Sequence, residues 1–535
     1  MSSKPAAGAA GPPAIGRSLG RLLALLDRLF DRLYGSRFNP IYQSGNLAIL
    51  FFLVTLATGL YLFLFYRIAD AHGSVVEIQQ RVFLGAWARS MHRYSADLAI
   101  VAVILHLLRK LAHGQTWGPR AVAWISGIVL LGVVLLSGWT GLVMVWDRQG
   151  QQIAVEGARL ADLLPIFSEP IARNFSGETP IPSSFFFMNL FLHVALPLGI
   201  AAVLWLHVSR LARPALLPPR AVRRYVLALL VVYAAVAPVR LPPAADLTQL
   251  PDRLATDLFF AFWLPLAQRV EPLAHLGFWL ALFSLLVALP WLWRPRREIA
   301  PSFVDEDHCT GCTNCYQDCP YEAIAMVPRT LAERQHSPLV ARVDPTRCVG
   351  CGICAGSCAP MGVGPAERTG RDQLAAARAF LERERPGPRQ IVILGCANGH
   401  AATLARLAGP QRSILPTGCG GSVHTSVLEL LLRRGAGGVF LLTCSPRDCY
   451  FREGPKWLAA RVFDGREAEL PERVDRLRVE VASFSPGEWP RIVAALGDLE
   501  ARVDRLGGGT VEAWEPELVC ETPAESEAGV EVAHA

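Results

Sequence analysis

The fold is decided by two apolar segments, RVFLGAWARSMHRYSADLAIVAVILHLLRK (81–110) and SSFFFMNLFLHVALPLGIAAVLWLHVSR (183–210). Each segment holds two histidines fourteen positions apart, and the pairs are His92 with His106 and His193 with His207. On an α-helix this spacing is a rise of about 21 Å and a return to within about 40° of the same face. Two such helices present four imidazoles in two layers, which suits two heme b groups stacked across a bilayer. A single intramembrane histidine is more often a polar residue facing the bundle, but the repeated spacing disfavours that interpretation.

The composition divides the chain into a membrane part and a soluble part. Of its 535 residues, 52% are hydrophobic and only 18% are charged, and the mean hydropathy is +0.31. The net charge of +6 needs no nucleic acid to explain it, because arginines cluster at the ends of the apolar runs. We therefore expect the lipid bilayer, and no nucleic acid, among the partners.

Six apolar runs are candidate membrane spans, at about 45–66, 83–111, 121–146, 184–210, 222–239 and 273–293. Most approach or exceed the roughly 20 residues that cross a bilayer. Six spans place both termini on one side, where the short loops hold eleven Lys and Arg against eight in the longer opposite loops. The positive-inside rule then predicts a multi-pass protein of the cytoplasmic (inner) membrane with both termini in the cytoplasm. His92 and His193 would share the outer layer, and His106 and His207 the inner one.

The first 44 residues form a separate segment ahead of the first span. Within it, RSLGRLLALLDRLFDRLY (17–34) alternates charged residues with Leu and Phe at helical spacing. We expect a cytoplasmic amphipathic helix that lies at the membrane interface. A helix packed on a soluble domain is the alternative.

Twelve of the thirteen cysteines lie between Cys309 and Cys449 in short, regular spacings, which favours metal clusters over disulfides. Two runs of C-x2-C-x2-C-x3-C stand about thirty residues apart. In such runs three thiolates hold one iron–sulfur cluster and the fourth crosses to the other cluster. The predicted ligands of the first cluster are Cys309, Cys312, Cys315 and Cys358. Those of the second cluster are Cys348, Cys351, Cys354 and Cys319. Zinc held by four thiolates is the alternative.

Strand-like runs alternate with helical patterns over 389–507, which predicts an α/β domain with a mostly parallel sheet. Its four cysteines lie at strand ends or in the turns that follow, and they are Cys396, Cys419, Cys444 and Cys449. Because the carboxyl ends of parallel strands build sites in such sheets, we expect one more iron–sulfur cluster there. The alternative is that some of these cysteines are buried structural thiols.

The membrane part resembles cytochrome b of the bc complexes over residues 36–293. Besides the histidines, the first and third runs carry glycines that are again fourteen apart, namely Gly45, Gly59, Gly127 and Gly141. In that family such glycines let heme edges approach the backbone. Arg89 and Arg109, three residues before His92 and after His106, match the family's heme-propionate partners. The resemblance implies that these residues and the four histidines bind two heme b groups.

One departure from the family concerns the loop before the sixth run. The Pro-Glu-Trp-Tyr signature, whose Glu takes part in quinol oxidation, is replaced by Ala255, Thr256, Asp257 and Leu258. Heme binding therefore carries over, whereas a bifurcating quinol site of the bc type does not. Asp97 and Asp257 are candidate proton-handling carboxylates in the outer half, and other catalytic residues are unknown. The alternatives are an ion pair of Asp97 with Arg93 and a solvated loop position for Asp257.

The two soluble parts carry resemblances as well. Residues 300–364 resemble the bacterial two-cluster ferredoxin fold, which implies two [4Fe-4S] clusters. Residues 389–507 resemble the delta subunit of methyl-viologen-reducing hydrogenases through the segment LLTCSPRDCYFREG (441–454). That family implies a [2Fe-2S] cluster and a flavin-containing partner of the heterodisulfide-reductase type. Its early Cys-x-x-Cys is reduced here to Cys396, so His400 is an alternative ligand.

The expected fold class is multi-domain, with an all-α transmembrane bundle of about six spans, an α+β ferredoxin-like domain and an α/β iron–sulfur domain. The bundle occupies 45–296 and the ferredoxin-like domain 297–366. A helical linker (367–388) leads to the α/β domain (389–507), and an acidic tail (508–535) low in hydrophobic residues is expected to be disordered.

These parts predict a membrane-bound electron-transfer protein, a subunit of a quinone-linked oxidoreductase complex that can be dimeric. A cytoplasmic flavin or iron–sulfur oxidoreductase is expected to dock on the α/β domain. The two ferredoxin clusters would connect that domain to the inner heme, and quinone would bind near one heme. The alternative is a non-catalytic membrane anchor and relay in a larger complex, whose quinone or substrate chemistry belongs to another subunit.

Overall fold

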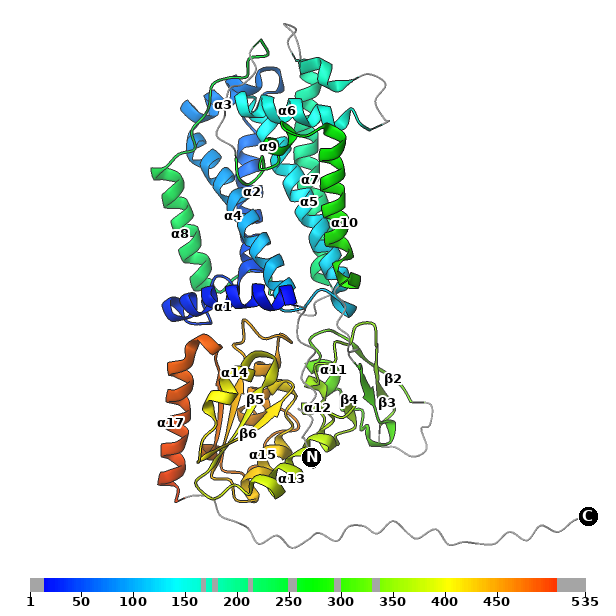
Figure 1. The fold of residues 1–535 in the computed structure, drawn as a ribbon, viewed down its shortest axis with the longest axis vertical. Helices are drawn as coiled ribbons and strands as arrows, with labels where there is room; N and C mark the ends of the chain where they lie inside the picture. Colours follow the sequence, from blue (N-terminus) through cyan, green and yellow to red (C-terminus); the bar gives the residue numbers. More distant parts are fainter. Residues whose placement is uncertain are drawn as a thin grey trace, which may run out of the picture.

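The computed structural model describes residues 14–164, 170–175, 181–209, 215–248, 257–292, 300–329 and 337–507. The acidic tail (508–535) and the aligned positions Ala255 and Thr256 lie outside the described residues. A bundle of long helices stands on top of two smaller domains that contain strands (Figure 1). The expected fold class, a helical membrane bundle followed by α+β and α/β parts, is confirmed.

Six long helices form the bundle and match the six apolar runs. They are α2 (Ser44–Phe63), α4 (Gly85–Ala112), α5 (Ala121–Val145), α7 (Ser183–Ser209), α8 (Arg220–Val236) and α10 (Pro272–Leu292). Among the described residues, four segments are long and apolar enough to cross a membrane: α2, the Gly118–Val145 segment that contains α5, α7 and α10. The other two differ for identifiable reasons, since α8 has only 17 residues and α4 carries several charged residues. A count of six spans remains a prediction.

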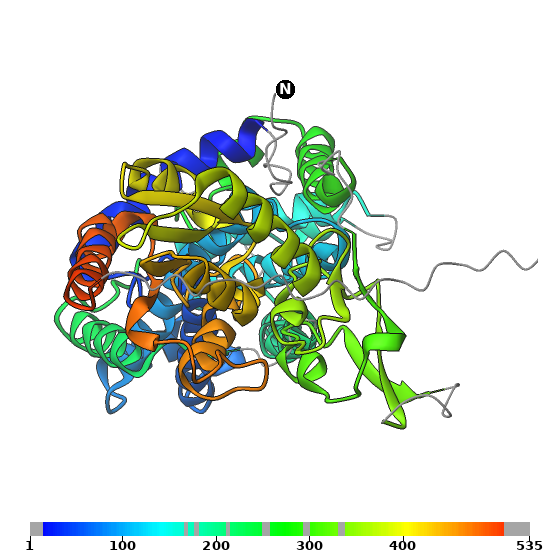
Figure 2. The ribbon, with the colours of Figure 1, turned by 90° about the horizontal axis from the view of Figure 1, so that it is seen from below.

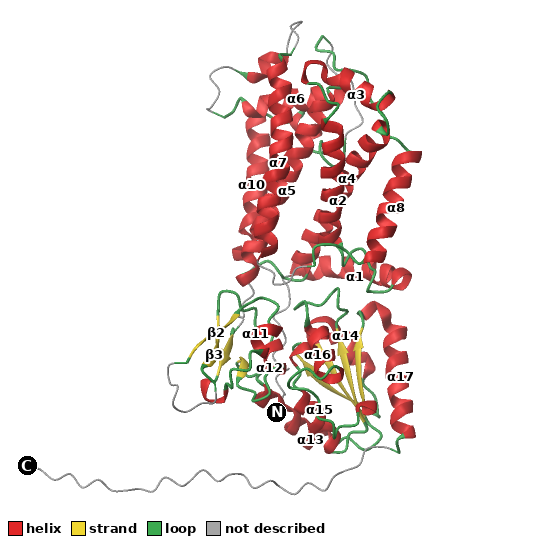
Figure 3. Cartoon of the chain, turned by 180° about the vertical axis from the view of Figure 1, so that it is seen from behind, coloured by secondary structure: helices red, strands yellow, loops and turns green. Residues whose placement is uncertain are grey.

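The bundle consists of two helix pairs with further helices outside them. α2 packs along α4, and α5 packs along α7. α8 lies against α4 on one flank and α10 against α5 on the other (Figures 1 and 3). Many large apolar side chains on the outer faces of these helices are exposed, as lipid-facing surfaces require.

Two helices that the sequence did not predict cover the end of the bundle that is farther from the two soluble domains, which is called the outer end below. They are α3 (Ala71–Gln80) and α6 (Arg148–Ala161). Each begins after an aspartate whose carboxylate accepts a hydrogen bond from a backbone N–H of the first turn, Asp70 from Gly73 at 3.0 Å and Asp147 from Gly150 at 2.8 Å. Such N-terminal caps stabilise the start of a helix.

The ferredoxin domain (300–366) contains two short antiparallel sheets. β1 (Ser302–Val304) pairs with β4 (Val363–Pro365), and β2 (Ile324–Pro328) pairs with β3 (Leu339–Val343). Each cysteine run contains one short helix, α11 (Asn314–Asp318) in the first and α12 (Ile353–Gly356) in the second. The residues before the two helices, Thr313 and Gly352, both have a positive φ. The two halves of the domain therefore repeat the same local structure.

The α/β domain that resembles the delta subunit, called the delta-like domain (389–507) below, has a parallel sheet of order β6-β5-β7-β8. The strands are β5 (Ile391–Cys396), β6 (Arg412–Thr417), β7 (Gly438–Thr443) and β8 (Val479–Ser483). Helices α14 (Ala397–Leu407), α15 (Thr425–Arg433), α16 (Gly454–Phe463) and α17 (Trp489–Arg505) surround it. The linker forms α13 (Gly370–Glu384), whose Ala377 and Phe380 are buried in the core of this domain.

Helix α1 (Ala14–Tyr34) crosses the base of the bundle, directly above the delta-like domain (Figures 1 and 2). Leu22, Leu25 and Leu33 are more than half exposed, whereas Asp31 is buried. Asp31 accepts a hydrogen bond from the Ser485 hydroxyl of the delta-like domain at 2.5 Å. The helix thus packs its polar face on a soluble domain, as the alternative expected, and a position at the membrane interface for its exposed apolar face stays a prediction.

Candidate redox centres

The outer histidines face each other across the bundle. The ring centroids of His92 and His193 lie 6.2 Å apart, with the ring planes 58° apart. Each Nδ1 lies 2.9 Å from a backbone carbonyl oxygen, that of Thr55 for His92 and that of Ser137 for His193. When Nδ1–H donates a hydrogen bond to the carbonyl oxygen, Nε2 carries no proton and is free to bind a metal. Since a metal binds imidazole nitrogen at about 2 Å, this spacing fits one ion between the two rings.

Four glycines make room for the four imidazole rings. A Cβ added to Gly59 would lie 3.0 Å from Cε1 of His92, and one on Gly141 would lie 2.8 Å from Cε1 of His193. At the inner layer, the corresponding distances are 2.8 Å from Gly45 to Nδ1 of His106 and 3.2 Å from Gly127 to Cε1 of His207. From the sequence we expected these glycines to let the heme edges approach the helix backbone. In the structure the glycines also admit the histidine side chains themselves.

A hydroxyl residue precedes each of these glycines, a signal that the sequence analysis missed. The four residues are Ser44, Thr58, Ser126 and Thr140. The hydroxyl oxygen of Thr58 is 3.3 Å from Nδ1 of His92, and that of Thr140 is 3.3 Å from Nδ1 of His193. Ser126 is 3.0 Å from Nδ1 of His207. The hydroxyl-Gly pair therefore places a polar atom beside the ring nitrogen that does not ligate.

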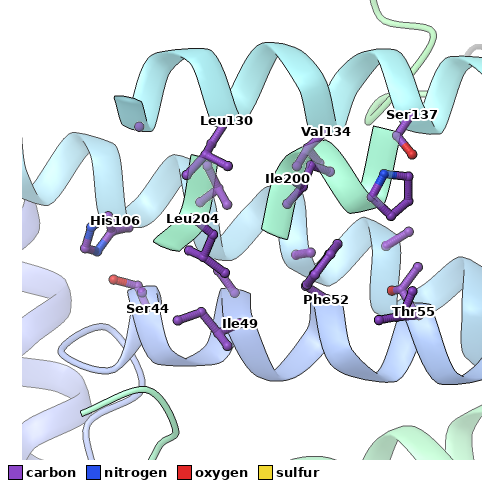
Figure 4. A pocket seen from close by; sticks show the side chains of 18 of the residues that line it. Ser44, Ile49, Phe52, Thr55, His106, Leu130, Val134, Ser137, Ile200 and Leu204 are labelled. Atoms are coloured by element: carbon purple, nitrogen blue, oxygen red, sulfur yellow. The ribbon is translucent and has the colours of Figure 1, made fainter. Parts of the chain in front are cut away.

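One cavity of about 1890 Å³ connects the two histidine layers. All four histidines line it, and so do Arg89 and Arg109. Between the layers its wall is mostly apolar, with Ile49 and Phe52 from α2, Leu130 and Val134 from α5, and Ile200 and Leu204 from α7 (Figure 4). The cavity exceeds the roughly 300–1,000 Å³ of a site for one small ligand. Its size and its two layers of ring nitrogens fit two heme groups.

Both arginines expected at the heme propionates lie at the cavity wall and also have protein partners. Arg89 donates to the side-chain oxygen of Gln79 and to the carbonyl oxygen of Val239, both at 2.9 Å. Arg109 pairs with Asp27 of α1 at 2.9 Å and with Asp448 of the delta-like domain at 2.5 Å. Arg109 thus ties the inner end of the bundle to a soluble domain, which the sequence did not predict.

The two candidate carboxylates of the outer half share one arginine. Asp97 pairs with Arg93 at 3.2 Å, as the alternative interpretation expected. Asp257 also pairs with Arg93 and accepts hydrogen bonds from the backbone N–H groups of Phe259 and Phe260. Its side chain is only 10% exposed, so Asp257 is not a solvated loop residue. All three charged side chains line the large cavity.

The structure groups the ferredoxin cysteines as the crossed spacing predicts. A second, small cavity is lined by Cys309, Cys312 and Cys315 of the first run together with Cys358 of the second. Burial, together with the neighbouring Cys348 and Cys319, raises the pKa of the Cys354 thiol to about 12, and a hydrogen bond with Ser302 opposes this rise. Within the described residues, no three His, Cys, Asp or Glu side chains are placed to hold a single metal ion. The assignment of these cysteines to two clusters stays a prediction.

The four cysteines of the delta-like domain meet at one edge of the sheet. Cys396 ends β5, Cys419 follows β6 and Cys444 follows β7, so adjacent parallel strands deliver three of them. The sulfur atoms of Cys444 and Cys396 lie 3.5 Å apart. Hydrogen bonds of Cys396 with Cys419 and of Cys444 with Cys449 complete the group. Four converging thiols can hold an iron–sulfur cluster.

His400 lies beside this group with its Nε2 directed elsewhere. Nε2 is 3.1 Å from the carbonyl oxygens of Thr443 and Phe484, which accept a hydrogen bond from Nε2–H. Nδ1 is buried and has no hydrogen-bond partner. Four thiols are already grouped, so His400 is not needed as a fourth ligand.

The fold and these centres define a membrane cytochrome joined to iron–sulfur domains, and the comparisons agree. Three family models match: "Cytochrome b/b6/petB" over 29–214, "4Fe-4S dicluster domain" over 308–362, and "Methyl-viologen-reducing hydrogenase, delta subunit" over 391–507. Cytochrome b6 of Acaryochloris marina (strain MBIC 11017) is 30% identical over 172 residues, 32% of this chain and 80% of the relative. The cytochrome b subunit of menaquinol:cytochrome c reductase from Geobacillus thermodenitrificans is 29% identical over 177 residues, 32% and 79% of the two chains.

The chain belongs to the cytochrome b family through its membrane part, and it carries a 4Fe-4S dicluster domain and a hydrogenase delta-subunit domain behind it. It is therefore a membrane protein with heme b and iron–sulfur clusters, and its role is electron transfer. A solved structure titled "Hyperthermophilic respiratory Complex III" matches with a TM-score of 0.39 and 21% identity over 47% of this chain and 75% of that one.

Proposed function

We propose that the chain carries electrons between a cytoplasmic flavin or iron–sulfur oxidoreductase and the quinone pool. The path uses two [4Fe-4S] clusters, one [2Fe-2S] cluster and two heme b groups. The observation that carries the proposal is the single cavity, which is lined by both histidine layers and, at its inner end, by Cys449 of the delta-like domain. The related reductase named above is a menaquinol enzyme, which supports quinone as the membrane partner.

Bound heme supplies one-electron chemistry at each histidine layer. The chain's own residues bind the heme and exclude water from its surroundings. The carbonyl oxygens of Thr55 and Ser137 fix the orientation of His92 and His193. The apolar wall between the layers keeps water out of the middle of the bundle.

Quinone chemistry moves protons together with electrons, and the outer half offers carboxylates for this task. Asp97 and Asp257 face the cavity beside the outer histidines. Arg93 holds both carboxylates, so a proton taken up by one leaves the other paired. With both termini in the cytoplasm, this proton exchange occurs at the outer side. Electron transfer between cytoplasm and outer side then works with or against the membrane potential, about 2.3 kcal/mol per charge per 100 mV.

The second candidate is a relay subunit whose quinone chemistry belongs to another subunit of the complex. The observation in its favour is Asp257, which follows Thr256, the residue aligned with the missing signature Glu, and is tied to Arg93 and to backbone N–H groups. A carboxylate held in this way needs rearrangement before it can accept a proton from quinol.

One experiment separates the two candidates. The purified chain is reduced chemically, and the heme b absorbance is followed while a short-chain quinone is added. Rapid heme reoxidation is expected from the first proposal, and hemes that stay reduced would leave only the relay role. Replacement of His193 by Ala should remove the outer heme and spare the inner one. Loss of the inner heme alone would refute the pairing of His92 with His193.

A further inference from the structure

We infer that the cluster of the delta-like domain is the centre next to the inner heme, and that the first ferredoxin cluster (Cys309, Cys312, Cys315 and Cys358) is the far end of the path. This inference rests on the proposed function as an electron path, and it reverses the expected order. A soluble partner then exchanges electrons at the ferredoxin domain. One electron at a time passes from the first to the second ferredoxin cluster, to the delta-like cluster and to the inner heme iron, each centre being reoxidised as the next is reduced.

The segment 446–450 (PRDCY), called the contact loop below, brings the delta-like cluster to the membrane bundle. Asp448 of this loop pairs with Arg109 at 2.5 Å, and Arg109 follows the inner ligand His106 by three residues. The next residue is Cys449, which lines the same cavity as His106 and His207. A thiol ligand and two imidazole ligands therefore border one continuous space.

The short segment between α4 and α5 fixes the contact loop from the other side. The side-chain amide of Gln115 donates to the carbonyl oxygen of Tyr450 at 3.1 Å, and Arg120 donates to the same oxygen at 3.3 Å. The guanidinium of Arg120 also lies 4.9 Å from the centre of the Tyr450 ring, a favourable cation–π contact. Cys449 therefore lies between Asp448 and Tyr450, which both contact the membrane bundle.

The second ferredoxin cluster adjoins the delta-like cluster. Arg347 and Val349, which flank its ligand Cys348, also line the large cavity, but among the described cysteines only Cys449 does. Its predicted ligands Cys351 and Cys354 share one buried cluster of side chains with Cys419 and Phe451 of the delta-like domain. Gly352, which lies between these two ligands, approaches the delta-like domain so closely that an added Cβ would lie 3.1 Å from Cβ of Ser422. These contacts place the second ferredoxin cluster within reach of the delta-like cluster.

The first ferredoxin cluster does not border the large cavity, although its ligands Cys315 and Cys358 belong to the same buried cluster of side chains as Cys351 and Cys354. The residues that line the cavity around Cys309, Cys312, Cys315 and Cys358 are absent from the lining of the large cavity. Two ligands of the first cluster, Cys309 and Cys312, are partly exposed. In the delta-like cluster Cys396, Cys419 and Cys444 are buried, and the partly exposed Cys449 lines the large cavity. The aromatic ring of Tyr316, next to Cys315, is also half exposed. The end of the path that is open to a soluble partner is therefore in the ferredoxin domain.

The test injects an electron at the far end and observes the heme. The full-length protein carries Tyr316→Cys together with Cys520→Ser, which removes the thirteenth cysteine, in the acidic tail. The new thiol is labelled with a ruthenium photosensitiser, and a laser flash reduces the first cluster. Heme b reduction is followed by its absorbance, without quinone. Rapid heme reduction is expected in the labelled parent. It should be lost in Cys449→Ser, while the ferredoxin clusters, observed by electron paramagnetic resonance, are still reduced.

A second variant tests the same contact without removing a cluster ligand, in case Cys449→Ser fails to fold. Asp448→Asn removes no ligand but breaks the contact with Arg109, and it should slow heme reduction by about tenfold or more, since a broken buried charge pair weakens docking at least that much. Asp475→Asn, on a separate turn of the same domain before β8, should leave the rate unchanged. Heme reduction at the parental rate in both Cys449→Ser and Asp448→Asn would overturn the inference. Because no quinone is present, that outcome would not bear on quinone reactivity.

Discussion

The fit of each imidazole against a glycine makes the heme sites sensitive to a single methyl group. In Gly141→Ala the new Cβ would lie 2.8 Å from Cε1 of His193, and the rigid helix backbone cannot move it away. Overpacking of this kind costs about 1–3 kcal/mol, and here it displaces a ligand. We expect Gly141→Ala to lose the outer heme, one of the two, in a quantitative heme assay. Gly199→Ala on α7, where nothing lies within 4 Å of the added Cβ, should keep both. Equal heme content in the two variants would contradict this explanation of the glycines.

The buried carboxylate of Asp27 gives the protein a pH dependence with a defined sign. Burial raises the pKa of Asp27 to about 6; Arg109 opposes this rise and Asp448 adds to it. Two carboxylates around one guanidinium leave an excess negative charge, so one of them binds a proton readily. Because the folded pKa exceeds the value of about 3.9 for an unfolded chain, this contribution to stability is complete below about pH 4 and is lost as the pH rises through 6.

Asp27→Asn mimics the protonated form and should therefore respond differently to pH. We expect the melting temperature of the variant relative to that of the natural protein to rise between pH 5 and pH 7. Paired melting curves in detergent measure this difference. A difference that stays constant over the range would show that Asp27 is already ionised at pH 5.

At the scale of elements, α16 joins the two soluble domains through a buried arginine. Arg461 is fully buried and donates to the Ser357 hydroxyl at 3.0 Å and to the Gly421 carbonyl oxygen at 2.6 Å. It also faces Asp318 at 3.8 Å. Asp318 and Ser357 are the residues before Cys319 and Cys358, the two cysteines that are predicted to cross between clusters. The same cation therefore supports both crossing points.

Arg461→Met should destabilise the soluble part and change its redox behaviour. Loss of one partner of a buried charged network costs about 3–5 kcal/mol. A cation close to Cys419 and Cys354 favours the reduced, more negative state of their clusters, so its removal should lower their reduction potentials. Denaturant titration followed by cluster absorbance, and a redox titration followed by electron paramagnetic resonance, measure the two effects.

The matched control for this substitution is Arg473→Gln. Arg473 pairs with Glu429 of the same domain. The Arg473 side chain is 67% exposed, and Glu429, which is only 10% exposed, keeps a second partner in Arg433. Exposed pairs contribute little, so neither stability nor potential should change. If Arg461→Met lowered stability and left every potential unchanged, its role would be structural only.

The sequence predicted those elements that follow from a local pattern of hydrophobic and polar residues. Hydrophobic periodicity located the six long helices to within a few residues, and the strand pattern placed Cys396, Cys419 and Cys444 at strand ends. α3 and α6 were missed because they lie in polar loops, where an aspartate followed by a short helical stretch is a weak signal. The Arg109–Asp448 contact joins residues 339 positions apart. No local pattern encodes such a pair.

For the whole molecule, the positive-inside rule gives a prediction about orientation. Alkaline phosphatase, which is active only outside the cytoplasm, should be inactive when it is fused after residue 507 and active when it is fused in the loop before α3. The physical reason is the excess of Lys and Arg in the loops on the side of the soluble domains. Activity of the fusion after residue 507 would invert the topology, and the iron–sulfur domains would then face outward.

The arrangement of the bundle has a consequence for biogenesis. α2 and α4 form one hairpin that contains His92 and His106, and α5 and α7 form another that contains His193 and His207. Every glycine-to-imidazole contact stays within one hairpin, Gly45 and Gly59 in the first and Gly127 and Gly141 in the second. Each hairpin can thus enter the bilayer with its histidines already oriented, before any prosthetic group is available. The two hairpins face each other mainly across the cavity. Each heme binds one histidine from each hairpin, so heme binding joins the two hairpins. We therefore expect the heme supply to set the yield of assembled protein.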